Sequence, residues 1–144
     1  MKIHKFAPIT IIATILSAAC AKSEITIDNA WIRTPPPNMN MTAAYLVLHN
    51  NTADTITLIG ANSDAYADVT VHESRVVDGV SEMIRMRSLS LSAGERLVFR
   101  PGGLHLMMTK PTRSLVQGDE TTITLQFADR KLVPTQAIVS DSMP

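Results

Sequence analysis

Residues 71–107 read VHESRVVDGVSEMIRMRSLSLSAGERLVFRPGGLHLM, and the architecture of the chain can be inferred from this stretch. Asp78-Gly79 is a dipeptide typical of the two-residue turn that joins antiparallel strands. Polar and apolar residues alternate around it and again after residue 103, as they do in half-buried strands. The stretch therefore predicts a β-hairpin followed by further short strands.

The same stretch carries four side chains with soft, uncharged donor atoms: His72, Met83, His105 and Met107. Thioether sulfur selects Cu(I), and imidazole nitrogen also suits copper. Zinc is a poor match, because its usual protein ligands are thiolate, imidazole and carboxylate. These four residues are the candidate metal ligands, and the metal that they favour is Cu(I).

Strand parity separates candidate ligands from packing residues. His105 and Met107 are two residues apart, so they share one face of a strand, whereas Met108 points to the other face. Met86 has the opposite parity to Met83 and is expected to face away from it. Met83 and Met107 are therefore ligand candidates, while Met86 and Met108 are expected to pack in the interior.

The hairpin brings His72 and Met83 to one face in either of two registers. If Asp78-Gly79 is the whole loop, the two residues are diagonal neighbours, about 7–8 Å apart at Cα. If the loop begins at Val76, they lie directly opposite one another. The sequence leaves both registers open.

Composition limits the function classes. The 144 residues suffice for one domain, and they include eight Met but one Trp and two Tyr. Removing residues 1–21 takes Lys2 and Lys5 from the 13 basic residues and none of the 13 acidic ones, so the mature chain is slightly acidic. Such a balance gives no basic patch for nucleic acid. The single cysteine, Cys20, excludes a disulfide framework within the domain.

The N-terminus has the features of an export signal over residues 1–21. A short basic start precedes the apolar residues 6–16, which are too few to span a bilayer permanently. Small residues offer cleavage sites next to Cys20. Lipidation of Cys20 is the alternative, although Ser17 stands where lipoprotein signals usually have Leu. Both alternatives place the protein outside the cytoplasm, in a bacterial periplasm, either free or lipid-anchored.

The mature chain is expected to be all-β. Alternating runs separated by turn signals predict strands at 25–31, 43–49, 56–60, 67–73, 80–86, 88–91, 96–100, 104–110, 121–127 and 131–140. The sequence does not decide whether 80–86 and 88–91 are separate. No helical period or repeat is found, so a β-sandwich or barrel spanning residues 22–140 is predicted, followed by a loose tail at 141–144. Pro134 should lie at an edge or bulge.

The spacing of the four candidate ligands resembles the signature of the periplasmic copper chaperone PCuAC family. His72, ten residues, Met83, twenty-one residues, His105, one residue and Met107 fit it without a gap. The likeness extends to other segments: Ala30-Trp31-Ile32-Arg33, Ala43-Ala44-Tyr45 with Asn50, Val71-His72-Glu73, and Pro101-Gly102-Gly103-Leu104. It therefore covers nearly the whole mature chain.

The resemblance implies a cupredoxin-like Greek-key β-sandwich that binds Cu(I) at one exposed end and has no enzymatic activity. Family members carry copper to the copper-bearing subunit of cytochrome c oxidase, sometimes alongside a Sco-type thiol protein. Some have a longer His- and Met-rich tail for another copper ion. Only Met143 stands in the tail here, so a second site is not expected.

Three other functions stay open at this point: copper sequestration for tolerance, a periplasmic copper-dependent redox enzyme, and a structural or adhesive sandwich. The lack of a cysteine after Cys20 argues against a blue-copper electron carrier, which uses a Cys thiolate. Met39 and Met41, beside the prolines at 35–37, are candidates for additional thioethers. His49 is expected to be structural.

Overall fold

The computed structural model describes residues 24–144, so the expected export signal and Cys20 lie outside the described residues. This part of the chain forms ten strands: β1 (Ile25–Arg33), β2 (Met41–Asn50), β3 (Ile56–Ser63), β4 (Tyr66–Val77), β5 (Val80–Arg85), β6 (Leu89–Leu91), β7 (Arg96–Phe99), β8 (Leu104–Pro111), β9 (Glu120–Phe127) and β10 (Leu132–Ser140). Within residues 24–144 no helix is long and apolar enough to cross a membrane.

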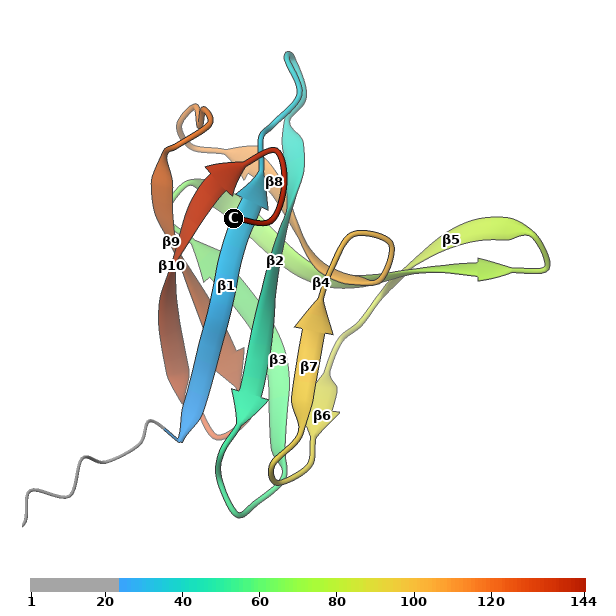
Figure 1. The fold of residues 1–144 in the computed structure, drawn as a ribbon, viewed down its shortest axis with the longest axis vertical. Coiled ribbons are helices and arrows are strands. Elements are labelled where there is room, and N and C mark those ends of the chain that lie inside the picture. Colours follow the sequence, from blue (N-terminus) through green and yellow to red (C-terminus); the bar gives the residue numbers. More distant parts are fainter. Residues whose placement is uncertain (1–23) are drawn as a thin grey trace, which may run out of the picture.

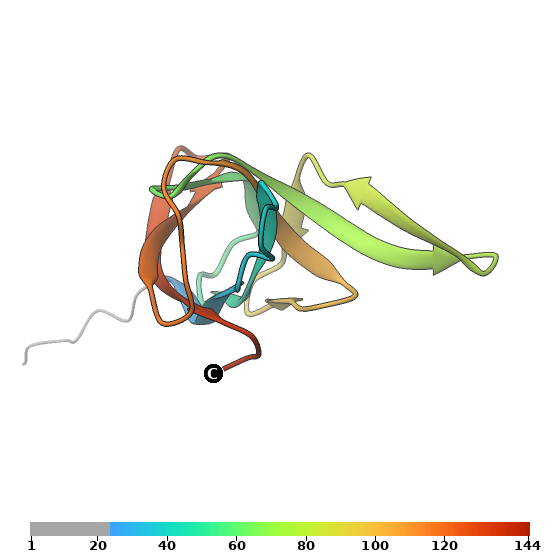
Figure 2. The same ribbon diagram turned by 90° about the horizontal axis from the view of Figure 1, so that it is seen from above.

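The strands form one sheet in the order β5-β4-β8-β7-β2-β1-β10-β9-β3-β6, with a further pairing between β8 and β2. The sheet curls around a central core, while β4 and β5 extend away from the body as a long hairpin (Figures 1 and 2). β1 runs antiparallel to β2 and parallel to β10. The all-β, cupredoxin-like expectation is confirmed.

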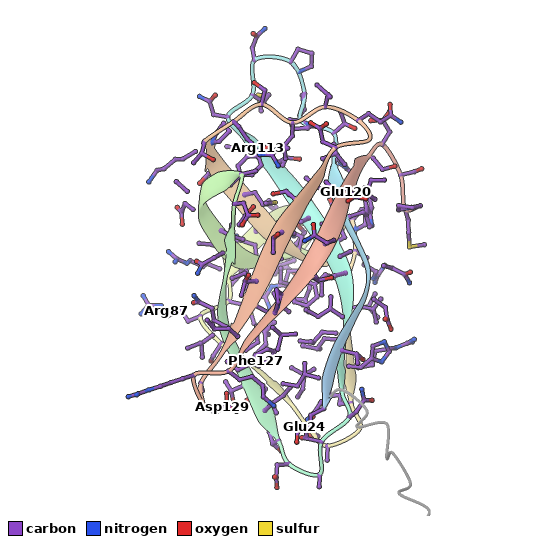
Figure 3. The ribbon with its side chains drawn as sticks, turned by 90° about the vertical axis from the view of Figure 1, so that its left-hand side faces the viewer. Glu24, Arg87, Arg113, Glu120, Phe127 and Asp129 are labelled. Carbon is purple, nitrogen blue, oxygen red and sulfur yellow. The ribbon has the colours of Figure 1, made fainter. Side chains whose placement is uncertain are left out.

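The core lies between the two layers of the curled sheet. Ile123 and Leu125 are completely buried, and so is Phe127 at the end of β9 (Figure 3). Residues from every strand except β5 enter the same cluster, including Ile32, Leu46, Leu48, Leu58, Leu106, Met108 and Val139. Burying large aliphatic side chains of this kind contributes about 1.5–3 kcal/mol each. The body of the sandwich is thus a rigid support for the residues on its outer face.

The β4–β5 hairpin has the two-residue loop. Asp78 (φ 51°) and Gly79 (φ 78°) both have left-handed backbone conformations, as a type I′ turn requires. Val77 therefore pairs with Val80, and Ser74 pairs with Met83. The observed register is the one in which His72 and Met83 are diagonal neighbours.

The strand boundaries show whether residues 80–91 form one strand or two, and where Pro134 lies in the sheet. β5 ends at Arg85, and β6 is a separate strand that pairs with β3. Pro134 lies opposite Thr124 of β9, whereas the pairing of β10 with β1 covers Ile138–Ser140. Because Pro134 lies outside the segment that pairs with β1, its missing N–H costs no hydrogen bond to β1, as expected for an edge position.

A buried asparagine fixes the lower end of β2. Asn50 is fully buried, and its Nδ2 lies 3.1 Å from the carbonyl oxygen of Leu91 and 2.9 Å from that of Ser92. Its Oδ1 accepts hydrogen bonds from the backbone N–H and the hydroxyl of Thr52, at 3.0 and 2.7 Å. These bonds tie β2 to the end of β6 and compensate for burying the amide.

Candidate metal site

Three neighbouring strands bring the candidate ligands to one outer face of the sheet. His72 of β4 lies directly opposite His105 of β8. Met107 is two residues further along β8, opposite Ala43 of β2, and so shares the face of His105. The intervening residue, Leu106, is completely buried in the core on the other face.

The two imidazoles lie side by side. Their ring centroids are 5.9 Å apart and their planes differ by 22°, so the rings of His72 and His105 are stacked. This arrangement follows from the strand register, because directly opposite residues on antiparallel strands project in the same direction. Two ring nitrogens can therefore face the same point in space.

His105 is held in one orientation by the loop that precedes β8. It is 5% exposed, and its Nδ1 donates a hydrogen bond to the carbonyl oxygen of Gly103 at 3.0 Å. The same carbonyl accepts the backbone N–H of Ser74 at 3.1 Å, which ties the loop to β4. Fixing the proton on Nδ1 leaves Nε2 with a free lone pair, which is the state that a metal ligand needs.

His72 is biased toward its neutral form. Its Nδ1 lies 3.3 Å from Oγ1 of Thr70. Burial lowers the pKa of His72, and the nearby positive charges of His105 and Arg85 lower the pKa further, against the opposing effect of the Thr70 contact. Glu73 projects to the opposite face of β4, so the orienting contact comes from a hydroxyl rather than from this carboxylate. A neutral imidazole can bind a metal without first losing a proton.

A shallow pocket of about 320 Å³ lies on this face. Its walls include Met83 from β5, His105 and Met107 from β8, and Met41 from β2. Met83 is 54% exposed, so its thioether is reachable from solvent. His72 is not among the lining residues and lies beside the pocket, against the ring of His105.

Several other candidates lie elsewhere. Met108 is completely buried and Met86 packs against the core, in agreement with their strand parity. Nε2 of His49 lies 3.0 Å from Oδ2 of Asp28 on β1, which gives this histidine a structural partner as expected. Met39 lines a different hollow. Sequence reasoning treated Met39 and Met41 alike, and the structure separates them.

The donor atoms available limit the metals that can bind. Over residues 24–144, no group of three or more His, Cys, Asp and Glu side chains is placed to hold a metal ion. The donor atoms that line the pocket are instead the imidazole of His105 and the thioethers of Met41, Met83 and Met107. Soft, polarisable thioethers fit Cu(I) and do not fit zinc, calcium or magnesium.

An aromatic pair borders the pocket, and sequence reasoning did not assign it there. Tyr45 lines the pocket and packs on Trp31, with ring centroids 4.6 Å apart. The guanidinium of Arg33, also a lining residue, lies 5.8 Å from the centroid of the Tyr45 ring. Burial raises the pKa of Tyr45 and Arg33 opposes this effect. Alternation along β2 from Ala43 would have placed Tyr45 on this face.

The chain end approaches the same side of the molecule. Residues 141–143 turn back across β1 (Figure 1). They line a neighbouring apolar hollow of about 470 Å³ that also includes Trp31 and Arg33. Arg113, by contrast, lines the hollow that includes Met39, and its Nη2 donates a hydrogen bond to the carbonyl oxygen of Glu120 at 3.0 Å; both residues are labelled in Figure 3.

The fold is a β-sandwich, and its outer face carries a pocket lined by imidazole and thioether side chains. A family model described as "Putative lipoprotein LpqE-like" matches residues 25–139, so the chain belongs to the LpqE-like family. The expected PCuAC-type membership is thereby confirmed.

Two curated relatives are each 29% identical to this chain. "Putative lipoprotein Lxx21020" of Leifsonia xyli subsp. xyli matches over 81% of this chain and 70% of the relative. "Uncharacterized protein RP573" of Rickettsia prowazekii matches over 83% of this chain and 66% of the relative.

Solved structures with the same fold include PCuAC domains. The copper-bound PCuAC domain from PmoF2 has a TM-score of 0.69 and 22% identity, covering 83% of this chain and 95% of that domain. Apo-DR1885 from Deinococcus radiodurans has a TM-score of 0.64 and 25% identity, covering 99% of this chain and 95% of that protein. Its Cu(I)-bound form has a TM-score of 0.63, with 24% identity over 88% of this chain and 85% of that one.

Proposed function

We propose that this protein is a Cu(I) metallochaperone whose cargo is held by His72, Met83, His105 and Met107. The observation that carries the proposal is the stacked His72–His105 pair with the thioethers of Met107 and Met83 on the same outer face. The copper-bound state of the similar PmoF2 and DR1885 domains supports the choice of metal.

The ligand chemistry suits transfer better than storage. Uncharged imidazole and thioether ligands offer no anionic attraction, and Arg33 places a positive charge at the pocket. Cu(I) is then held by donor bonds that exchange one at a time. As a ligand of the acceptor approaches, the exposed thioether of Met83 can leave first, while the buried His105 leaves last. No change in oxidation state is needed.

The proposed acceptor is the copper-bearing subunit of cytochrome c oxidase, and a Sco-type thiol protein is proposed to act in the same delivery. Delivery requires a protein outside the cytoplasm, which agrees with an export signal over residues 1–21 and a copper-binding domain over residues 22–140. The similar proteins named as lipoproteins support anchoring through a lipidated Cys20. In this proposal the domain moves copper and catalyses no reaction.

Anaerobic Cu(I) titration against a competing colorimetric chelator tests the site. We expect one tight equivalent, which is lost in His105→Ala and retained in the matched control His49→Ala, because His49 is paired with Asp28 far from the pocket. Met83→Leu and Met107→Leu should weaken binding by at least about tenfold, or 1.4 kcal/mol. Met39→Leu is their control. Equal affinities for Met83→Leu and Met39→Leu would contradict the assigned ligand set.

A transfer assay tests the role. The Cu(I)-loaded domain is mixed with the apo copper-bearing oxidase domain, and copper on each protein is measured after separation. Transfer faster than from a Cu(I)–chelator complex of equal affinity is the result expected for a chaperone. Retention of copper by the loaded domain would contradict delivery and indicate sequestration.

A further inference from the structure

We propose that Met41 is a third thioether of the pocket and exchanges with Met83 as a ligand of Cu(I). This inference rests on the proposed copper function and adds a residue outside the four-residue spacing. Met41 lines the same hollow as Met83, His105 and Met107. It is 45% exposed, so its sulfur is accessible both to the pocket and to solvent.

The strand register places Met41 near Met107. On the β2–β8 pair, Ala43 lies opposite Met107 and Met41 lies opposite Thr109. Met41 and Met107 are therefore diagonal neighbours on one face, about 7–8 Å apart at Cα, within reach of two long side chains. Ala43, directly opposite Met107, also lines the pocket and has only a methyl group as its side chain.

The start of β2 is firmly placed. Thr42 points inward, is 9% exposed, and donates its hydroxyl hydrogen to the carbonyl oxygen of Arg33 at 2.6 Å. Because adjacent residues alternate between faces, this bond fixes the outward direction of Met41. Met39, two residues earlier, instead lines a hollow that includes Tyr66 and Pro111. Proximity to the prolines alone therefore does not make a methionine part of the pocket.

Met41 and Met83 approach the pocket from opposite sides. β4 and β8 lie between β5 and β2 in the sheet, and neighbouring strands are about 4.8 Å apart. His105 and Met107, both on β8, lie between the two exposed thioethers. A copper ion on these central ligands can form a bond to Sδ of Met41 as its bond to Sδ of Met83 breaks. The ion stays Cu(I), and neither a proton nor an electron moves.

Such an exchange gives the ion two bound positions, one toward the β4–β5 hairpin and one toward β2. The β2 side is the one that carries Arg33 and Pro36 at the pocket wall. An acceptor that docks on this side would meet copper already released from Met83. Met41 would thus set the rate of copper release more than the affinity.

Methionine methyl NMR tests this inference. The domain is labelled with ¹³C at the methionine methyl groups, titrated anaerobically with Cu(I), and assigned by Met→Leu variants. We expect the methyl signals of Met83, Met107 and Met41 to shift, while Met39 and Met143 do not. In Met83→Leu the Met41 response should grow, because the competing thioether is gone. Release of copper to a chelator should slow several-fold in Met41→Leu but not in Met39→Leu.

The outcomes separate the two proposals. If no methionine signal responds to Cu(I), the proposed copper function fails. If Met83 and Met107 respond and Met41 does not, only the role of Met41 is overturned. A Met41 shift that is unchanged in Met83→Leu, or a release rate that is unchanged in Met41→Leu, also overturns the exchange.

Discussion

His72 and His105 lie directly opposite on β4 and β8, with their rings stacked at a centroid distance of 5.9 Å. A positive charge on His105 at this distance disfavours protonation of His72. Burial acts in the same direction and lowers the pKa of His72. The neutral ring of His72 is thus available to a metal and is sensitive to acid.

Acid should lower both the folding stability of the apo domain and its affinity for Cu(I). Since the pKa of His72 is lower in the folded chain than its usual 6.5, the unfolded chain binds more protons between these two values. The stabilising contribution is complete above about pH 6.5 and is lost as the pH falls through the lowered pKa. We expect the melting temperature to fall below pH 6.5, less steeply in His72→Gln, with Cu(I) affinity falling over the same range. His49→Gln is the control, and identical pH slopes in wild type and His72→Gln would contradict the prediction.

The turn of the β4–β5 hairpin should control copper affinity through Met83. Gly79 has a φ of 78°, so Gly79→Ala strains the backbone by about 1–2 kcal/mol and loosens the hairpin. Gly94, between β6 and β7, has a φ of 74° and serves as the matched control. Both variants should unfold at lower urea concentration, but only Gly79→Ala should also bind Cu(I) more weakly. Equal copper affinities would show that the hairpin does not position a ligand.

Substituting the adjacent methionines Met107 and Met108 of β8 should affect different properties: copper affinity for Met107 and folding stability for Met108. Met108 is completely buried, so Met108→Ala should lower the free energy of unfolding by about 2–5 kcal/mol. Met107 projects to the outer face, and Met107→Ala should destabilise the apo domain much less while reducing copper affinity. Denaturant unfolding and Cu(I) titration of both variants measure the two effects. Copper loss in Met108→Ala with a stable fold would contradict the facing argument.

Asn50 should matter for stability without affecting copper. In Asn50→Ala the carbonyl oxygens of Leu91 and Ser92 lose their buried partner, which costs about 1–3 kcal/mol. Thermal unfolding should show the loss, and Asn51→Ala, whose side chain makes one exposed contact to Thr26, should show little. Cu(I) affinity at low temperature should stay that of the wild type. A copper defect in Asn50→Ala would mean that the end of β2 communicates with the pocket.

Local signals in the sequence were sufficient to predict the strands and the hairpin turn, but they did not decide the register of the hairpin. Asp78-Gly79 predicted the turn, and alternation predicted a strand over 121–127, which the structure has at Glu120–Phe127. Strand parity also put Met86 and Met108 on the packed side. These features depend on neighbours in the chain, which a sequence displays directly.

Contacts between distant segments could not be predicted in the same way. The burial of His105 depends on the loop before β8 and its bond to Ser74 of β4, and nothing near residue 105 in the chain encodes that contact. The difference between Met39 and Met41 likewise depends on the pairing of β2 with β8. The parallel pairing of β1 with β10 joins the two ends of the domain, and no local pattern in the sequence indicates it.

That parallel pairing has a consequence for how the chain matures. β1 gains one of its two partners only when Ile138–Ser140 are available, and Lys131 reaches Glu24 across the same long interval. Folding by such distant contacts is intrinsically slow, on the order of milliseconds to seconds. In a nascent chain of this topology, β1 lacks its β10 partner until the final strand has been synthesised. The two halves of the sheet therefore join, through β1 and β10, only after the last strand has been synthesised.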